Sequence, residues 1–284
     1  MFRFFNNLPP PCSVISFNLT KGIFFLKKIL FKVKDAFYEK KESTQYTSPK
    51  IETNEKVEKS LPDGNRVIYF ESDSAFLDIN VQGSNNLVEI GKLLPGITGK
   101  ISINLYGEDC SVVLSDRLWV SQYLTICVGQ NHPNFGKVRN VKVELGSDVS
   151  IEGCVIITYN SNTKVSLGSR CMLSFGITIY NTDGHPILDK RTNKIINKVR
   201  DVVIEEHCWL GANSTILKNV HIPQDSIVGW GAVVTSGSLK QFGTKNDSPL
   251  QNSGVILSGN PARICKTEIT WSQNGSAGYV DNVN

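Results

Sequence analysis

An aliphatic side chain returns at every sixth position over one stretch of this 284-residue chain. The unbroken series is Ile204, Leu210, Ile216, Ile222, Val228 and Val234. A compact residue stands two positions before each of the later members: Cys208, Ser214, Val220, Ser226 and Ala232. The same spacing recurs more loosely upstream, at Leu145, Ile151 and Ile157, and at Leu167, Leu173 and Ile179. Short β-prone runs divided by turns could also come from an ordinary sandwich, so the period decides the fold.

A period of six residues has a simple physical meaning. Each flat strand with its turn takes six residues, and three such sides close one triangular coil. The aliphatic residue of each repeat points inward and stacks on its equivalent in the next coil, so the coils stabilise one another as neighbours are added. Glycine and asparagine at the corners supply backbone conformations that a β-carbon resists. The period predicts a mainly β fold, a solenoid of parallel strands, but it indicates no chemistry.

The chain divides into three zones, and we expect domain boundaries that give residues 1–64, 65–266 and 267–284. Residues 20–41 carry an apolar stripe at helical spacing, formed by Ile23, Leu26, Leu30, Val33 and Phe37. This spacing predicts a basic amphipathic helix, which either lies on a membrane surface or packs on its own domain or on a second copy. The packed arrangement is favoured because such stripes are usually core. A polar linker, residues 42–64, separates this helix from the β-prone zone.

Composition excludes several classes of protein. The 30 basic and 26 acidic residues are too evenly balanced for a nucleic-acid-binding surface. The seven cysteines are scattered and never form a Cys-x-x-Cys pair, which argues against disulfides and zinc and favours a reducing cytoplasm. The N-terminus lacks the pattern of a secretory signal, and the apolar stretch at residues 23–31 is too short and too charged to cross a bilayer. We therefore expect a cytoplasmic protein.

His185 is the candidate for chemistry. It stands between a repeat and an insertion, residues 188–201, that breaks the six-residue period. Such an insertion leaves the histidine at the edge of a coil with a projecting arm beside it. Histidine suits the role of a general base because its ordinary pKa lies near working pH. Asp183 either orients the imidazole or forms a turn with Gly184. The remaining histidines, His132, His207 and His221, are interpreted as loop or surface residues.

Four blocks of sequence carry a resemblance to a known family. They are residues 181–187 (Asn-Thr-Asp-Gly-His-Pro-Ile), 201–204 (Asp-Val-Val-Ile), 209–217 (Trp-Leu-Gly-Ala-Asn-Ser-Thr-Ile-Leu) and 259–264 (Gly-Asn-Pro-Ala-Arg-Ile). In this order they resemble the hexapeptide-repeat acyltransferases, and in particular bacterial polysaccharide O-acetyltransferases, including those that acetylate sialic-acid capsules. The match covers about residues 145–266, whereas no motif covers the N-terminal third.

The resemblance implies a left-handed parallel β-helix that moves acetyl from acetyl-CoA to a hydroxyl of a bacterial surface glycan, either capsule or lipopolysaccharide. It implies a homotrimer with active sites between subunits. It makes His185 the catalytic base and places the indole of Trp209 beside the thioester. The indole N–H would donate to the developing oxyanion, or the ring would pack against the pantetheine. The backbone N–H groups of Gly211 and Ala212 are rival donors.

The resemblance also implies a set of contacts to coenzyme A. Ala212 matches the residue whose backbone meets the pantetheine arm, and Trp230 stands where most members have alanine. Thr235 and Ser236 match a block that is Thr-Lys in many members, so one phosphate contact is altered here. Arg263 fits a phosphate-binding role because a guanidinium bonds phosphate in a forked geometry. The insertion at residues 237–253 is either a lid over the coenzyme or a longer surface loop.

Two other functions stay open at this point. One is acetylation of an amine on a nucleotide-linked amino sugar, with the same base and donor. The other is a non-catalytic β-helix, either a scaffold or an ice-binding surface, although the sequence has no regular threonine array. Zinc is not expected, because γ-class carbonic anhydrases of this fold have two histidines five positions apart and this chain has no such pair. No cysteine or serine near His185 suggests a covalent carrier, which favours direct attack. The basic helix hints at contact with the inner face of the membrane.

Overall fold

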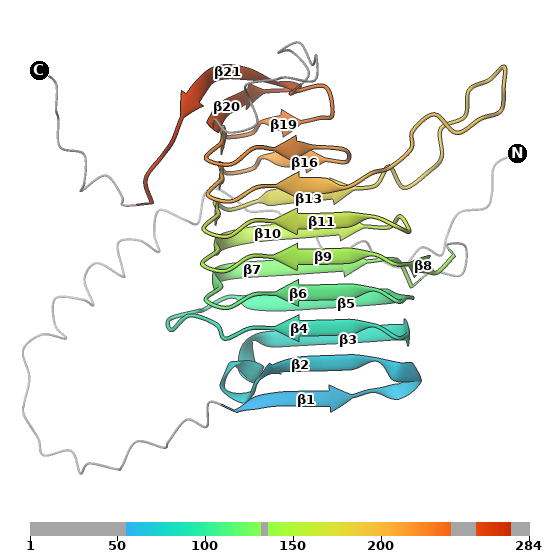
Figure 1. The fold of residues 1–284 in the computed structure, drawn as a ribbon, viewed down its shortest axis with the longest axis vertical. Coiled ribbons are helices and arrows are strands. Elements are labelled where there is room, and N and C mark those ends of the chain that lie inside the picture. The colour runs from blue at the N-terminus through green and yellow to red at the C-terminus, as the bar shows by residue number, and fades with distance from the viewer. Residues whose placement is uncertain (1–54, 132–135, 240–253, 274–284) are drawn as a thin grey trace, which may run out of the picture. The chain divides into compact units, whose positions relative to one another are not determined.

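Successive β coils stack along one axis in the computed structural model, which describes residues 55–131, 136–239 and 254–273 (Figure 1). Apart from two short 3-10 segments, η2 (Pro62–Gly64) and η3 (Glu71–Phe76), the regular elements of these residues are strands. The prediction of a mainly β fold with parallel strands is confirmed. The helix expected at residues 20–41 lies outside the described residues. Within those residues, the structure contains no helix with the length and apolar composition to cross a bilayer.

One sheet forms the first face of the coil. Its strands, in order, are β1 (Lys56–Ser60), β2 (Arg66–Phe70), β4 (Leu87–Ile90), β6 (Ser111–Leu114), β9 (Lys142–Leu145), β11 (Lys164–Leu167), β14 (Val202–Ile204) and β17 (His221–Ile222). The pair β1–β2 is antiparallel, and the later neighbours run parallel.

A second sheet bends around a corner and forms the other two faces. The second face carries β12 (Met172–Leu173), β15 (Trp209–Leu210), β18 (Ile227–Val228) and β20 (Gly254–Gly259), and β21 (Ala262–Ile269) returns antiparallel to β20. The third face carries β3 (Leu77–Ser84), β5 (Lys100–Glu108), β8 (Val138–Arg139), β13 (Ile177–Asn181), β16 (Thr215–Leu217) and β19 (Val233–Val234). The long strands β7 (Trp119–Val128) and β10 (Ser150–Thr158) turn the corner, and β10 pairs with both β12 and β13.

The register confirms the six-residue period. Ile204 pairs with Ile222, Leu210 with Val228 and Ile216 with Val234, so one coil takes three repeats. All six aliphatic residues of the main series are buried, and so are the five compact residues that precede them. Burial of each large aliphatic side chain contributes roughly 1.5–3 kcal/mol to folding. The core is therefore a stack of aliphatic columns inside the coil.

The looser upstream spacing fails at one position. Leu145 and Ile151 are buried as expected, but Ile157 is half-exposed and its neighbour Ile156 is buried instead. A β-bulge between Ile151 and Gly153 shifts the register of β10 against β7 by one residue. A shift of one residue moves every later side chain to the opposite face of a strand. The prediction that Ile157 points inward is therefore wrong.

The corners of the coil are named here by the faces that they join. The first corner joins the first and second faces, and successive coils place Arg170, His207 and Asp225 there with positive φ angles of 59°, 54° and 62°. The second corner joins the second and third faces and carries Phe175 and Trp230. The third corner joins the third face to the first face of the next coil. The insertion after β13 leaves the coil at this third corner and projects as an arm (Figure 1).

Candidate active site

His185 lies at the third corner, where the chain leaves β13 for the arm. The hydroxyl Oγ1 of Thr182 accepts a hydrogen bond of 3.0 Å from the Gly184 N–H, and Gly184 has a φ of 72°. Glycine enters this left-handed region without the penalty that a β-carbon brings. The turn directs His185 outward, where its side chain is exposed. The arm beyond it is a hairpin, closed by a bridge between Leu188 and Ile195.

A cavity of about 200 Å³ lies between the arm and the coil edge. Tyr159 and Asn160 line it from the preceding coil, and Ile195 and Lys198 line it from the arm. Thr182, Asp183 and His185 lie on the segment between these two walls. Such a cavity is large enough to admit part of a small polar molecule beside the imidazole. The structure therefore places the predicted base in a concave setting lined by both polar and apolar groups.

The carboxylate of Asp183 is held by two groups that the sequence had not singled out. Oδ2 lies 2.5 Å from Lys218 Nζ and accepts a hydrogen bond of 2.7 Å from Asn197 Nδ2. The Lys218 side chain is only 17% exposed, so its charge needs this partner. Lys218 belongs to the third corner of the next coil. Only the closed coil brings it to Asp183, which explains why a linear motif did not reveal it.

Trp209 lies on the second face, at the start of β15, with a half-buried side chain. Its indole Nε1 is buried and has no hydrogen-bond partner among the described residues. The ring of Trp271, which follows β21, packs against it with ring centroids 5.9 Å apart and planes tilted by 42°. A buried N–H without an acceptor costs about 1–3 kcal/mol, which an incoming oxygen acceptor would recover.

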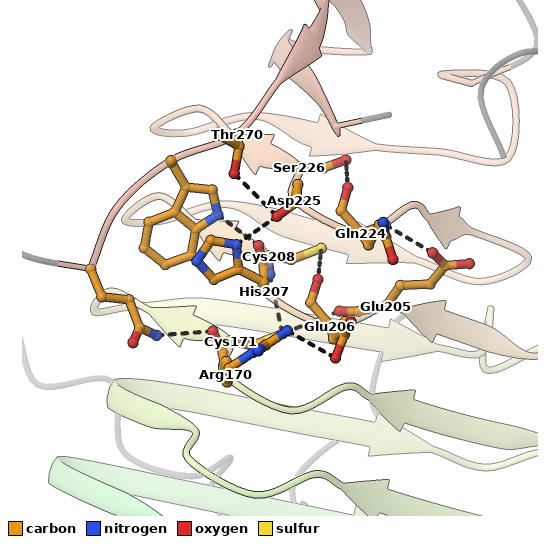
Figure 2. Close-up of polar contacts among 12 residues, drawn as sticks. Arg170, Cys171, Glu205, Glu206, His207, Cys208, Gln224, Asp225, Ser226 and Thr270 are labelled. Atoms are coloured by element: carbon orange, nitrogen blue, oxygen red, sulfur yellow. Dashed lines mark hydrogen bonds and ion pairs between the residues drawn. The ribbon is translucent and has the colours of Figure 1, made fainter. Parts of the chain in front are cut away.

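The chain beyond β21 is anchored at the first corner, next to Trp209. His207 Nδ1 lies 2.6 Å from Asp225 Oδ1, and Thr270 donates to the same carboxylate oxygen at 3.2 Å (Figure 2). Trp271 stacks on the His207 ring at 4.5 Å and donates from Nε1 to the His207 carbonyl oxygen at 2.6 Å. His207 lies at this corner of the coil with its side chain partly covered, at 21% exposed. Sequence reasoning missed Trp271 since nothing in the tail shows a repeat.

The other two histidines differ from His207. His221 is exposed on the first face, as expected, and its Nε2 lies 2.6 Å from Glu205 Oε1. His132 lies outside the described residues.

The residues expected to contact coenzyme A spread from the second corner over the last coils. The Gly211 N–H already donates to the Val228 carbonyl at 2.7 Å, and a β-carbon on Gly211 would approach the same oxygen to 2.7 Å. Gly211 is thus required by the stacking of coils, and its N–H is engaged. Ala212 is buried beside it. Trp230 is 68% exposed and packs edge-to-face on Phe175, with ring centroids 5.2 Å apart.

The three remaining positions lie at the C-terminal end of the coil. Thr235 follows β19, and its N–H donates a hydrogen bond of 2.9 Å to Ser238 Oγ. Ser236 is exposed and lines a groove on the first face together with His221. Arg263 is exposed on β21, where its guanidinium donates to the Ala262 carbonyl at 3.1 Å. Most of the insertion at residues 237–253 lies outside the described residues.

His185 and Trp209 do not meet within one chain. His185 is at the third corner, whereas Trp209 is on the second face, which is the side of the triangular coil opposite that corner. The structure brings Asp183, Asn197 and Lys218 to His185, and it brings Trp271 to Trp209. One chain thus presents two separate halves of the expected site.

Comparisons with known proteins identify similar sequences and a similar fold. The family described as the hexapeptide repeat of succinyl-transferase matches residues 201–236. A polysialic acid O-acetyltransferase of Neisseria meningitidis is 32% identical over 147 residues, which cover 48% of this chain and 68% of that protein. A polysialic acid O-acetyltransferase of Escherichia coli O1:K1 is 28% identical over 145 residues, which cover 51% of this chain and 42% of the relative.

A solved structure shows the same fold. The crystal structure of the polySia-specific acetyltransferase NeuO matches with a TM-score of 0.53 at 24% identity, over 72% of this chain and 92% of that one.

Fold and sequence together define an acyl-transferring enzyme built from six-residue repeats. The chain belongs to the hexapeptide-repeat acyltransferases. It is an O-acetyltransferase whose co-substrate is an acyl-CoA. The resemblance seen in the sequence blocks is confirmed.

Proposed function

We propose that this enzyme transfers acetyl from acetyl-CoA to a hydroxyl group of an acidic bacterial surface glycan of the capsular type. The observation that carries the proposal is the position of His185, exposed at a coil edge beside a cavity. The names of the two similar bacterial enzymes, both polysialic acid O-acetyltransferases, support an acidic polymer as the acceptor.

The charge of the arm also supports an anionic acceptor. Residues 187–201 hold five basic residues, Lys190, Arg191, Lys194, Lys198 and Arg200, against Asp189 and Asp201. A second groove, of about 670 Å³, shares Ile195 and Lys198 with the His185 cavity and is also lined by Arg200, Asp201 and His221. An excess of basic side chains on the arm raises the local concentration of an oppositely charged polymer. The acceptor chain would lie along this groove with one hydroxyl near His185.

The reaction follows from the chemistry of these groups. The His185 imidazole takes the proton of the acceptor hydroxyl as its oxygen attacks the thioester carbonyl carbon. The carbon–sulfur bond then breaks, the acetyl ester forms, and the proton passes to the departing thiolate. The Trp209 N–H, buried without an acceptor, fits the role of a donor to the carbonyl oxygen. None of the described residues that line the His185 cavity is a cysteine or serine, which supports direct attack.

The separation of His185 from Trp209 supports an active site shared between copies. Among the described residues, the exposed large apolar side chains lie at only two places, the second corner and the arm: Phe175, Trp230, Ile187, Leu188, Ile195 and Ile196. The outward side of the third face lies between these two places. Along β10, β13, β16 and β19 it carries the apolar side chains of Val155, Ile157, Tyr180, Leu217 and Val233. Exposed apolar patches of this kind mark interfaces.

A three-fold assembly that packs the third faces together would bring the arm of one copy to the second corner of the next. We infer a homotrimer on this basis. In each site His185 would come from one copy and Trp209 from its neighbour. Because the same patch pair repeats around the axis, the contact closes into a ring.

Acetyl-CoA would lie along the second corner of the neighbouring copy. The exposed Trp230 ring and the open backbone at Gly231, where a β-carbon would meet nothing within 4 Å, leave room for the pantetheine arm. Arg263 would bind a phosphate, and Ala212, Thr235 and Ser236 would complete the contact. We further propose a left-handed coil and a cytoplasmic location.

An acceptor panel tests the proposed function. Purified enzyme is incubated with acetyl-CoA and with a sialic-acid polymer, a neutral polysaccharide or a nucleotide-linked amino sugar, and release of the coenzyme A thiol is followed. We expect thiol release with the acidic polymer and a product whose acetyl group is removed by mild alkali, as an ester is. Thiol release with the amino sugar alone, giving an alkali-stable amide, would replace this proposal with N-acetylation. No thiol release with any acceptor would reject it.

A further inference from the structure

The side-chain carboxamide of Asn197, at the base of the arm, makes three hydrogen bonds. Nδ2 donates to Asp183 Oδ2 at 2.7 Å and to the His185 carbonyl oxygen at 2.9 Å. Oδ1 accepts a hydrogen bond of 2.7 Å from the Ile187 N–H. A primary amide has two donor hydrogens and one carbonyl acceptor, so each of its groups has a partner here. Such complete use of one half-exposed side chain indicates a specific task.

These bonds enclose the segment that carries the imidazole. The His185 carbonyl and the Ile187 N–H stand on either side of Pro186, whose ring fixes its own φ. With Gly184 already held by Thr182, the backbone is restrained both before and after His185. The direction in which the imidazole leaves the backbone is therefore set by Asn197, which is twelve residues further along the chain.

Lys218 ties this arrangement to the solenoid. Its ammonium group lies 2.5 Å from Asp183 Oδ2 and donates to the backbone carbonyl oxygen of Asn197 at 3.0 Å. Asp183, Asn197 and Lys218 thus form a closed set of contacts between the turn, the returning arm and the next coil. Because the coil is rigid, the turn that carries His185 is fixed relative to the groove.

We propose that Asn197 is a positioning residue for acetyl transfer, acting through the backbone of His185 and Ile187. This inference rests on the proposed role of His185 as the base. It assigns Asn197 a function distinct from holding the arm in place, because two of its bonds go to the catalytic segment itself. A misplacement of about 1 Å at a reacting group can cost on the order of 100-fold in rate.

Two variants and one control test the proposal. Asn197→Ala removes all three bonds, and Asn197→Asp keeps the shape and the acceptor but loses both donors. Asn80→Ala is the control, since Asn80 also donates one side-chain bond of 2.9 Å, to Tyr106, on a distant coil. We expect Asn197→Ala to lower kcat about 10- to 100-fold with KM for acetyl-CoA within about twofold of the parent value. Asn80→Ala should retain the parent kcat.

The pH dependence separates positioning from simple support of the fold. In Asn197→Asp the new carboxylate repels Asp183 at neutral pH, whereas its protonated form can donate one of the lost bonds. The activity of Asn197→Asp relative to the parent should rise as the pH is lowered, and that of Asn197→Ala should stay constant. An unchanged kcat in Asn197→Ala, or a loss confined to KM, would overturn the proposal.

Amide hydrogen exchange keeps this test independent of the proposed function. The Ile187 N–H should exchange slowly in the parent protein and at least about 10-fold faster in Asn197→Ala, because its acceptor is gone. An equal exchange rate would show that the hydrogen bond between the Ile187 N–H and Asn197 Oδ1 does not restrain this segment. If hydrogen exchange shows the Asn197 hydrogen bond but the parent enzyme acetylates no acceptor, the proposed function fails, and the role of Asn197 in catalysis fails with it.

Discussion

Two inactive variants should restore activity when their subunits are mixed. His185→Ala removes the base, and Trp209→Ala removes the indole from the opposite side of the coil. Within one chain these residues cannot reach the same substrate, because the second face lies opposite the third corner. If each site takes His185 from one copy and Trp209 from the next, a mixed assembly contains some sites in which both residues are intact.

The size of the recovery follows from the geometry of the assembly. In a random one-to-one mixture, a site is intact when the copy that provides His185 carries the tryptophan substitution and its neighbour carries the histidine substitution. About one quarter of the sites meet this condition in the unfractionated mixture, and one site in three meets it in every mixed trimer, because a ring of heterologous contacts with two kinds of subunit has one contact in the required order. The histidine variant alone should keep roughly 1% of parental turnover, since a positioned base contributes on the order of 100-fold. The recovered activity should therefore stand far above that background.

The assay is thiol release from acetyl-CoA after co-expression of the two variants with different affinity tags. Sequential purification on both tags isolates the mixed assemblies. The homogeneous variants, mixed only after purification without subunit exchange, are the control. Activity in the mixed assemblies no greater than that control would refute a site shared between copies.

Three other predictions concern the core, the coenzyme and the thiols. Leu210 is fully buried and stacks between Leu173 and Val228. Leu210→Ala should lower the free energy of unfolding, measured by urea titration, by about 2–5 kcal/mol, and a loss below about 1 kcal/mol would contradict the stacked core. Arg263→Ala should raise KM for acetyl-CoA with little change in kcat, and an unchanged KM would show that Arg263 does not bind a phosphate of the coenzyme. Burial raises the pKa of the Cys154 thiol. At pH 8, iodoacetamide should therefore leave Cys154 unmodified in the native protein while it labels the exposed Cys265. Equal labelling of the two residues in peptide mapping would show that Cys154 is accessible.

The repeat pattern determined most of what the sequence could predict of the fold. Six aliphatic residues at one spacing predicted the inward columns, because in a solenoid each coil contacts only its neighbours and the local pattern suffices. The prediction failed at Ile157, because Ser121 and Gln122 of β7 face the single residue Glu152 of β10, so that β10 is one residue short of the period. Such a shift is a backbone event, and the residue types at positions 152 and 153, Glu and Gly, give no unambiguous signal of it.

The candidate site was only partly predictable, for a different reason. His185 and its arm stand out because the insertion interrupts a regular period. Asn197 and Lys218 do not stand out, since the contacts to Asp183 exist only when the arm returns and the next coil closes over it. Trp271 lies beyond the last repeat and reaches His207 and Trp209 across the corner of the coil. Contacts between segments that follow no repeat need the three-dimensional structure.

The central claim is that His185 serves as the base of an acetyl transfer, and one kinetic comparison tests it most directly. Turnover of the parent enzyme and of His185→Ala is measured with saturating acetyl-CoA and a sialic-acid polymer. We predict a fall in kcat of at least about 100-fold in the variant, with coenzyme binding retained. A variant that keeps near-parental turnover would contradict the account.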